Sequence, residues 1–115
     1  MQVSFEDFKK LDIRIGKVLK VEDHPNADKL YLVTLDIGFD AEGKRIEKTL
    51  VAGIRAHYTK EELVGKFLAV ITNIEPATIR GIESCGMILA ASDKDKKHLF
   101  VLTPDKPIDA GSRVS

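Results

Sequence analysis

The chain has 115 residues, of which 43% are hydrophobic and 31% charged, and its eighteen basic residues balance eighteen acidic ones. This length supports a single domain with one hydrophobic core. One cysteine excludes an internal disulfide, and no apolar run approaches the ~20 residues that span a bilayer, so we expect a cytoplasmic protein. The zero net charge gives no support of its own to nucleic-acid binding, which usually accompanies a basic surplus.

The N-terminal third of the chain predicts a short helix followed by a long strand. Ser4 can cap a helix over residues 4–10, in which acidic residues precede lysines. From Leu11 the apolar residues alternate, which predicts a strand through Val21 with a bend or bulge at Gly16. HPNAD, residues 24–28, predicts a turn because proline fixes φ and Asn and Asp tolerate turn geometry.

The middle of the chain predicts further strands and one short helix. Residues 29–37 form the second expected strand, and a third ends near residue 52 after the connection GFDAEG. Thr59 and Glu62 make a capping box, with Gly65 suited to the C-terminal end of that helix. KFLAVITNI is apolar on both faces and predicts a central strand, and a fifth strand is expected at about residues 87–91.

Five strands with a short helix between the third and fourth predict an all-β protein. The order favours the OB-fold, a five-stranded Greek-key barrel over about residues 11–92, within one domain of residues 1–115. Residues 1–10 and 93–115 are then extensions. The tail contains the apolar strand LFVL, and Phe100 and its neighbours must either cover an exposed part of the barrel or meet a second subunit.

Catalysis has no positive support in the sequence. Cys85 lies in EPATIRGIESCGM, but His24, His57 and His98 stand in no protease or transferase signature that would supply a base. A lone cysteine at the start of a strand is usually a small buried apolar residue. Metal-ligand spacings and glycine-rich phosphate loops are absent as well, so we expect no enzyme activity, no cofactor and no metal.

Binding has more support, because OB-folds hold ligands between the loops joining strands one to two and four to five. On the predicted register these loops are HPNADK and EPATIRGIESCGM. Arginine can donate two parallel hydrogen bonds to a phosphate, while Asn and Ser can hydrogen-bond sugar or phosphate oxygens. The residues suited to an RNA backbone are His24, Asn26, Lys29, Asn73, Arg80 and Ser84. The competing interpretation is an ordinary turn, a solvated loop charge at Arg80 and a core position for Met87.

Two segments, HPNADKLY and RGIESxGMILAAS, resemble the tRNA-binding domain appended to methionyl-tRNA synthetases. Similar domains occur as free-standing bacterial tRNA-binding proteins and in a yeast synthetase cofactor. The resemblance covers roughly residues 5–103, and the chain looks like the synthetase module as a separate β subunit.

The resemblance implies an OB-fold that binds tRNA with little sequence preference and forms a homodimer through segments outside the barrel. It also implies a catalytic methionyl-tRNA synthetase subunit as partner, because the class I synthetase signatures are absent. Carried over by position, the tRNA-binding residues are Asn26, Lys29, Arg55, Asn73, Arg80, Ser84 and Met87.

The chain departs from the family pattern at Glu75 and Thr78, where relatives often carry lysines. Each phosphate contact contributes about 0.9 to the salt slope on duplex-like nucleic acid, so we expect weaker tRNA binding than in such relatives. The alternative function is an export-related chaperone or a stand-alone dimer that uses the same barrel, a role that Glu75 would suit.

Overall fold

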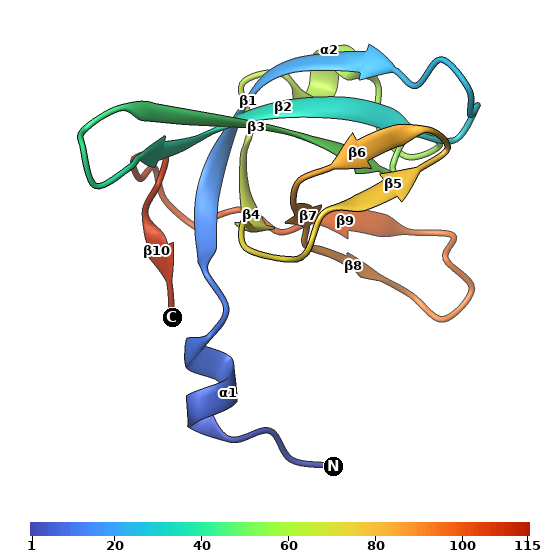
Figure 1. Cartoon of the computed structure of the whole chain (residues 1–115). Coiled ribbons are helices and arrows are strands. Elements are labelled where there is room, and N and C mark those ends of the chain that lie inside the picture. Colours follow the sequence, from blue (N-terminus) through green and yellow to red (C-terminus); the bar gives the residue numbers. More distant parts are fainter.

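The computed structural model describes residues 1–115 and contains two short helices and ten strands (Figure 1). The helices are α1 (Phe5–Lys9) and α2 (Lys60–Leu63). The longer strands are β1 (Ile13–Asp23), β2 (Tyr31–Phe39), β3 (Arg45–Ala52) and β4 (Phe67–Ile71). The short strands are β5 (Ala77–Ile79), β6 (Ile82–Ser84), β7 (Met87–Ile88), β8 (Ala90–Ser92), β9 (Leu99–Val101) and β10 (Arg113–Val114).

The main sheet is antiparallel, has the order β3-β2-β1-β4-β7 and curls into a half-barrel (Figure 1). β1 makes this curl possible because its first half pairs with β4 and its second half with β2. The sequence predicts a bend or bulge at Gly16, but the register irregularity of β1 lies between Val18 and Lys20. The space beside Gly16 is small, because a Cβ there would lie 3.2 Å from the side chain of Leu35.

The open edge of the half-barrel is joined by hydrogen bonds between β3 and the end of β6. The Cys85 N–H donates to the Thr49 carbonyl at 3.3 Å, and the Val51 N–H donates to the Ser84 hydroxyl at 2.9 Å. No paired ladder runs between β3 and β7. Of the expected five-stranded OB-fold barrel, the mostly β composition and the five-stranded antiparallel sheet are confirmed, and the sheet is a curled half-barrel whose open edge is joined only by these hydrogen bonds.

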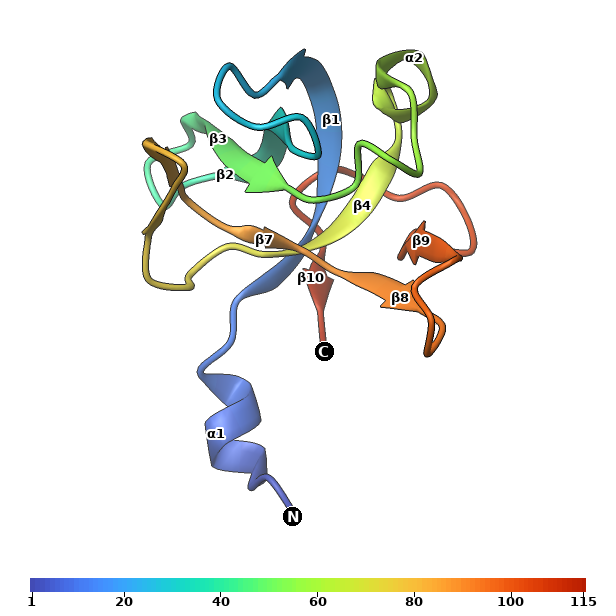
Figure 2. The same ribbon diagram turned by 90° about the vertical axis from the view of Figure 1, so that its right-hand side faces the viewer.

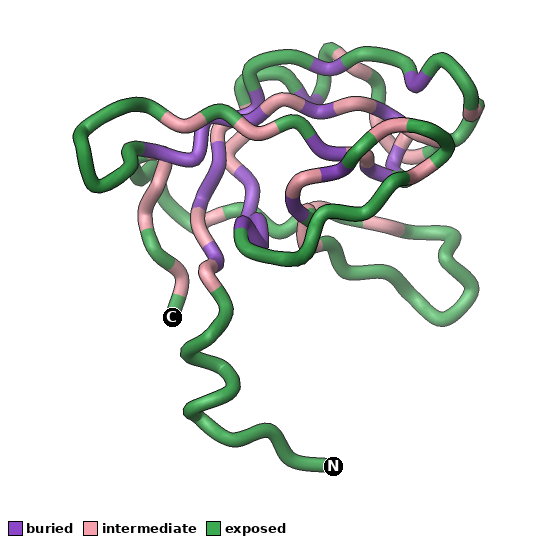
Figure 3. Tube along the Cα trace, in the orientation of Figure 1, coloured by how far each residue is buried: buried purple, intermediate pink, exposed green.

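The core consists of aliphatic side chains that face the inside of the curl, as the sequence predicts. Val33, Leu35, Leu50, Leu63 and Leu68 are completely buried. Each such side chain contributes roughly 1.5–3 kcal/mol by leaving water. Figure 3 shows the buried residues gathered on the curled sheet, whereas α1 is exposed along its whole length.

The predicted fifth strand is broken at Leu89. β7 pairs with β4, whereas β8 leaves the sheet and pairs with β9 from the tail. The Leu89 N–H donates to the Ala69 carbonyl at 3.0 Å, and its own carbonyl accepts from the Leu102 N–H at 3.1 Å. Leu99 and Val101 of β9 pack against the core, so the tail covers part of the barrel, while Phe100 faces away and is 61% exposed.

Both predicted helices form. The Ser4 hydroxyl accepts from the Asp7 N–H at the start of α1, and Thr59 and Glu62 form the expected capping box at α2. Neither helix is long and apolar enough to cross a membrane. α1 has no buried residue and projects away from the sheet (Figures 1 and 2).

The C-terminal segment returns to β1. The Gly111 N–H donates to the Ile15 carbonyl at 2.7 Å, and the Ile15 N–H donates to the Ser112 carbonyl at 2.8 Å. This return brings Gly111 against Gly38, where a Cβ on either residue would lie 2.7 Å from the other's Cα. The close approach leads β10 into its pairing with β1.

Candidate nucleic-acid interface

The stretch EPATIRGIESCGM is a β-hairpin in its central part, which sequence reasoning treated as a loop. β5 and β6 pair from Ala77 with Ser84 to Ile79 with Ile82, and the turn residues Arg80 and Gly81 have φ of 53° and 88°. Two positive φ angles are the signature of the tight type I′ turn, which matches strand twist. Arg80 is thereby held at the hairpin tip, exposed to solvent, in a backbone conformation that costs a non-glycine residue about 1–2 kcal/mol.

His24 joins the β1–β2 loop to this hairpin. Its side chain is only 3% exposed, its Nε2 lies 3.1 Å from the Ile79 carbonyl, and its Nδ1 accepts the Asn26 N–H at 3.0 Å. Because Nδ1 accepts a hydrogen bond, the ring proton lies on Nε2 and is donated to Ile79. Both ring nitrogens are used in these internal hydrogen bonds, so the expectation that His24 contacts RNA gains no support from the geometry and stays a prediction.

Asn26 makes the second connection between the two loops. Its side-chain Nδ2 donates to the Arg80 carbonyl at 3.2 Å, so two residues predicted to bind tRNA lie together at the hairpin tip. Lys29 lies in the same β1–β2 loop, is exposed and forms no ion pair. The predicted site lies between HPNADK and the stretch EPATIRGIESCGM, and these hydrogen bonds bring the two segments together.

Arg55 lies at the base of the β1–β2 loop, beside a polar cavity of about 430 Å³. Its guanidinium is 3.6 Å from the Asp23 carboxylate and 5.9 Å from the ring centroid of Tyr31. The same carboxylate holds Lys60 at 3.2 Å. Sequence reasoning missed Lys60, because only the folded chain brings the start of α2 to the end of β1.

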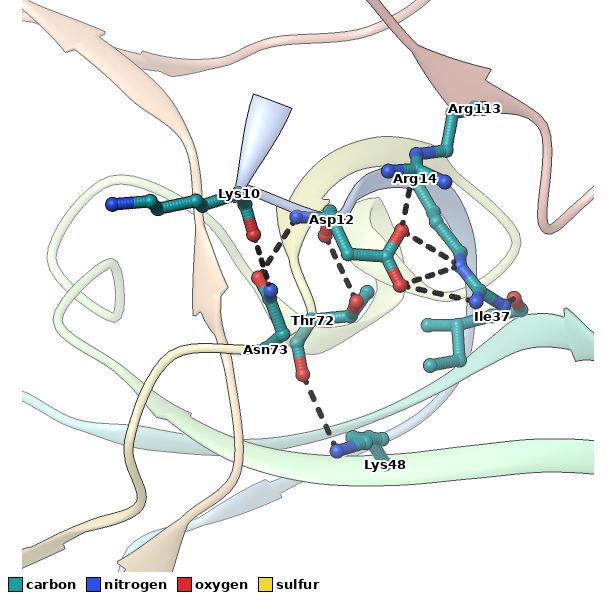
Figure 4. A network of polar contacts seen from close by, with 8 residues as sticks. All are labelled: Lys10, Asp12, Arg14, Ile37, Lys48, Thr72, Asn73 and Arg113. Carbon is teal, nitrogen blue, oxygen red and sulfur yellow. Dashed lines mark hydrogen bonds and ion pairs between the residues drawn. The ribbon is translucent and has the colours of Figure 1, made fainter. Parts of the chain in front are cut away.

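Asn73 lies at the other end of β4 and acts within the protein (Figure 4). Its Oδ1 accepts the Asp12 N–H at 2.8 Å, and its Nδ2 donates to the Lys10 carbonyl at 2.7 Å. Both ends of the amide are therefore occupied, and the prediction of a tRNA contact there is not supported. Asn73 instead fixes the segment that leads from α1 into β1.

Ser84 is likewise internal. It is 4% exposed, and its hydroxyl accepts the Val51 N–H at 2.9 Å and donates to the Gly86 carbonyl at 3.3 Å. Ser84 thus supplies the closing contact between β3 and the base of the hairpin, and the prediction that it faces RNA gains no support from this position. Met87, by contrast, is 44% exposed and lines cavities on both of its sides, of about 210 and 350 Å³.

A network around Asp12 holds the strand ends near Asn73 (Figure 4). The Arg14 Nε donates to the Asp12 carboxylate at 3.1 Å, and Arg113 of β10 approaches it at 3.4 Å. Partial burial acts to raise the pKa of Asp12, but the hydrogen bonds and the two guanidinium charges outweigh it and lower the pKa below its usual value. Arg14 and Arg113 therefore make their ionic contacts within the protein, with Asp12.

Cys85 does not resemble a nucleophile. Its thiol lies 3.4 Å from a Glu83 carboxylate oxygen, and this hydrogen bond, together with burial, raises the pKa of Cys85. A raised pKa keeps the sulfur as the less reactive thiol. No group of three or more His, Cys, Asp or Glu side chains is placed to hold a metal ion.

The fold and the joined loops define a small, curled β-sheet domain that presents cationic and polar side chains at one end. Residues 13–113 match the family described as "Putative tRNA binding domain". The chain therefore belongs to this tRNA-binding domain family.

The similar proteins include archaeal methionine–tRNA ligases. The chain is 50% identical over 112 residues to the ligase of Nanoarchaeum equitans and 47% identical over 112 residues to that of Pyrococcus horikoshii. These matches cover 97% of this chain but only 13% and 14% of the two ligases. The homology therefore reaches a small part of each ligase.

Solved structures support the same fold over the full chain. A MetRS-related protein from Pyrococcus horikoshii superposes with a TM-score of 0.86 at 28% identity, covering 100% of this chain and 99% of that one. The chaperone CsaA of Bacillus anthracis superposes with a TM-score of 0.83 at 27% identity, covering all of both chains. The similar proteins are thus named either as methionine–tRNA ligases and a MetRS-related protein or as a chaperone.

Proposed function

We propose that this chain is a non-catalytic OB-fold domain that binds tRNA with little sequence preference and presents it to methionyl-tRNA synthetase, as a β subunit or appended domain. The observation that carries the proposal is the connection of the β1–β2 loop to the β5–β6 hairpin through His24 and Asn26. This connection holds exposed Arg80 at the hairpin tip beside the loop that carries exposed Lys29. The family match and the ligase relatives support the same function.

The physical role would be tethering in the cytoplasm. A basic tip that contacts phosphates binds many RNA sequences alike, because phosphate contacts carry no base information. Holding tRNA close to a catalytic subunit raises its effective concentration there without new base contacts. Neither a cofactor nor a metal enters this proposed role.

The proposed domain is also a homodimer, with α1 at the contact between subunits. Phe5 is 70% exposed, Phe8 38% and Leu11 40%, and these residues line one surface with Val114 from the C-terminal extension. An apolar surface built from both chain extensions is typical of an isologous interface.

Titration of tRNA by gel shift at two salt concentrations tests the proposed function. Arg80→Ala should weaken binding and reduce its salt dependence, because one phosphate contact is lost. Cys85→Ala should leave tRNA binding nearly intact. Absent or salt-independent binding of the unaltered protein at low salt would contradict the proposal.

The second candidate is an export-related chaperone dimer, favoured by the similarity to CsaA. The groove beside Met87 is lined almost wholly by apolar residues, which suits an unfolded peptide better than phosphate. Competition between tRNA and an unfolded peptide for the protein distinguishes the two functions. Tight peptide binding without measurable tRNA binding would favour the chaperone.

A further inference from the structure

The turn between β8 and β9 carries three lysines that the proposed tRNA site leaves unused. Lys94, Lys96 and Lys97 are exposed and form no ion pair. Many other cations of the chain are paired with carboxylates, among them Arg14, Arg45, Arg55, Lys60 and Arg113. Asp93 and Asp95 offset two of the three charges, so the turn keeps a surplus of one positive charge despite the zero net charge of the chain.

This turn is ordered by its own hydrogen bonds. The Asp93 carboxylate accepts from the His98 N–H at 3.2 Å and lies 2.6 Å from the His98 Nδ1, while the Lys96 N–H donates to the Asp93 carbonyl at 3.0 Å. The contacts from His98 lower the pKa of Asp93, which keeps this carboxylate ionised and in place. A ligand that binds the lysines therefore meets a preformed turn and loses little backbone freedom on binding.

The β8–β9 turn projects on the same side of the molecule as the β1–β2 loop and the β5–β6 hairpin (Figure 1). Figure 2 faces this side and shows β7 running between the β5–β6 hairpin and β8. The groove beside exposed Met87 is lined by residues of β3, β7, β8 and Leu99 of β9. Two cationic tips thus flank an apolar groove.

An exposed aromatic ring accompanies the lysines. Phe100 is 61% exposed, and its ring centroid lies 6.0 Å from that of His98 in a tilted arrangement. The neighbouring residues Leu99 and Val101 pack on the core, so the strand holds the Phe100 ring outward. A cationic surface combined with an outward aromatic ring is the combination by which proteins bind unpaired nucleotides.

We propose that the β8–β9 hairpin is a second RNA-binding element, in which Lys94, Lys96 and Lys97 contact phosphates and Phe100 stacks on an unpaired base. This inference rests on the proposed tRNA binding and extends its surface across the groove beside Met87. The partner is the phosphodiester backbone of tRNA next to an unpaired base, since phosphate complements the cations and a base complements the ring.

Two sets of variants separate the two contributions in gel-shift titrations with tRNA. The triple variant Lys94→Gln, Lys96→Gln, Lys97→Gln should reduce the slope of log affinity against log salt by about 2, because it removes up to three phosphate contacts. The matched control Lys44→Gln, Lys66→Gln, Lys106→Gln removes the same charge from other turns and should change the slope much less. Equal changes from both triples would overturn the proposal.

Phe100→Ala should weaken tRNA binding roughly tenfold with an unchanged salt slope, because stacking is not an ionic interaction. Phe100→Tyr keeps an aromatic ring and should restore the affinity. Thermal unfolding identifies a variant that fails to fold, and Phe100→Tyr then decides the outcome. A Phe100→Ala variant that binds tRNA normally but has half the native mass in gel filtration would show that a second copy of the chain covers Phe100.

The same titrations separate this inference from the proposed function. If the unaltered protein fails to bind tRNA, the proposed function is wrong and this inference with it. If the unaltered protein binds and Arg80→Ala weakens binding, while the β8–β9 variants match their controls, only this inference is wrong.

Discussion

At the scale of single residues, polar side chains near a predicted loop divide into those that build the loop and those left for a partner. His24, Asn73 and Ser84 use their polar atoms inside the protein, whereas Lys29 and Arg80 keep their charges in solvent. Composition does not distinguish the two groups, because asparagine, serine and histidine suit both tasks. The folded structure separates them: His24 and Ser84 are buried, and the exposed Asn73 is engaged by backbone groups of Lys10 and Asp12.

His24 allows a direct test of how the site is positioned. In His24→Gln the side-chain amide can still donate to the Ile79 carbonyl in place of Nε2, so the hairpin should stay attached and tRNA affinity should stay near that of the unaltered protein. In His24→Asn the shorter amide can accept the Asn26 N–H but cannot reach Ile79, so tRNA affinity should fall several-fold. Gel-shift titration measures both.

Amide hydrogen exchange serves as the structural readout for this pair. In His24→Asn, exchange should become faster in the β5–β6 hairpin while the amides of the central strands stay protected. Equal tRNA affinity for the two variants would show that the bond from His24 to Ile79 does not position Arg80.

At the scale of elements, the strands follow the alternation of apolar residues, but their ends and partners depend on distant segments. The β5–β6 hairpin carries a local signal, since Thr78 and Ile79 precede Arg-Gly and Ile82 follows it. The break at Leu89 has no comparable signal, because it arises from pairing with a tail twelve or so residues further along. Glycine lies where two distant backbone segments come into close contact, as Gly38 and Gly111 do.

Gly38→Ala should destabilise the protein more than Gly43→Ala. Both glycines have positive φ, of 96° and 82°, so alanine is strained at either position. A Cβ on Gly38 would also meet the Gly111 Cα at 2.7 Å, whereas a Cβ on Gly43 meets nothing within 4 Å. We expect a loss in the free energy of unfolding of about 1 kcal/mol for Gly43→Ala and at least about 2 kcal/mol for Gly38→Ala.

Urea denaturation measures these losses. The difference between the two variants isolates the contact between the C-terminal extension and β2. Losses of the same size would mean that the tail can shift away from Gly38 without cost.

At the scale of the whole molecule, a net charge of zero does not show which cations are held in ion pairs and which are free to contact a ligand. Arg14 and Arg113 are held by Asp12, and Arg45 is held by the buried carboxylate of Asp36. The cations without ion pairs include Lys29, Arg80 and the lysines of the β8–β9 turn, and the β1–β2 loop, the β5–β6 hairpin and the β8–β9 turn project on one side (Figure 1). Other lysines without ion pairs, such as Lys44 and Lys106, lie in other turns. Net charge is therefore a poor guide to polyanion binding for this chain, because it does not separate cations held in ion pairs from cations that are free to contact a ligand.

The exposed face of α1 predicts the oligomeric state. Phe5→Ser combined with Phe8→Ser should convert the proposed dimer to a monomer, because it removes the apolar surface that α1 leaves in solvent. Gel filtration with mass measurement reports the change. Val64→Ser is the matched control, since Val64 is also an exposed apolar residue at 51% but lies beyond α2. A monomeric mass for the unaltered protein would contradict the dimer.

The sequence by itself determined the four long strands, the two helices and the family that the chain resembles, because apolar alternation, capping residues and the HPNADKLY and RGIESxGMILAAS segments are local features. It did not determine the β5–β6 hairpin, the break at Leu89 or β10. Only the tertiary structure decided which polar residues are free. Hydrogen bonds between positions far apart in the chain, such as His24 with Ile79, Asn73 with Asp12 and Ser84 with Val51, cannot be read from neighbouring residues. Those contacts exist because folding brings distant segments together, and the polar atoms that it buries, as at His24 and Ser84, must find partners inside the protein.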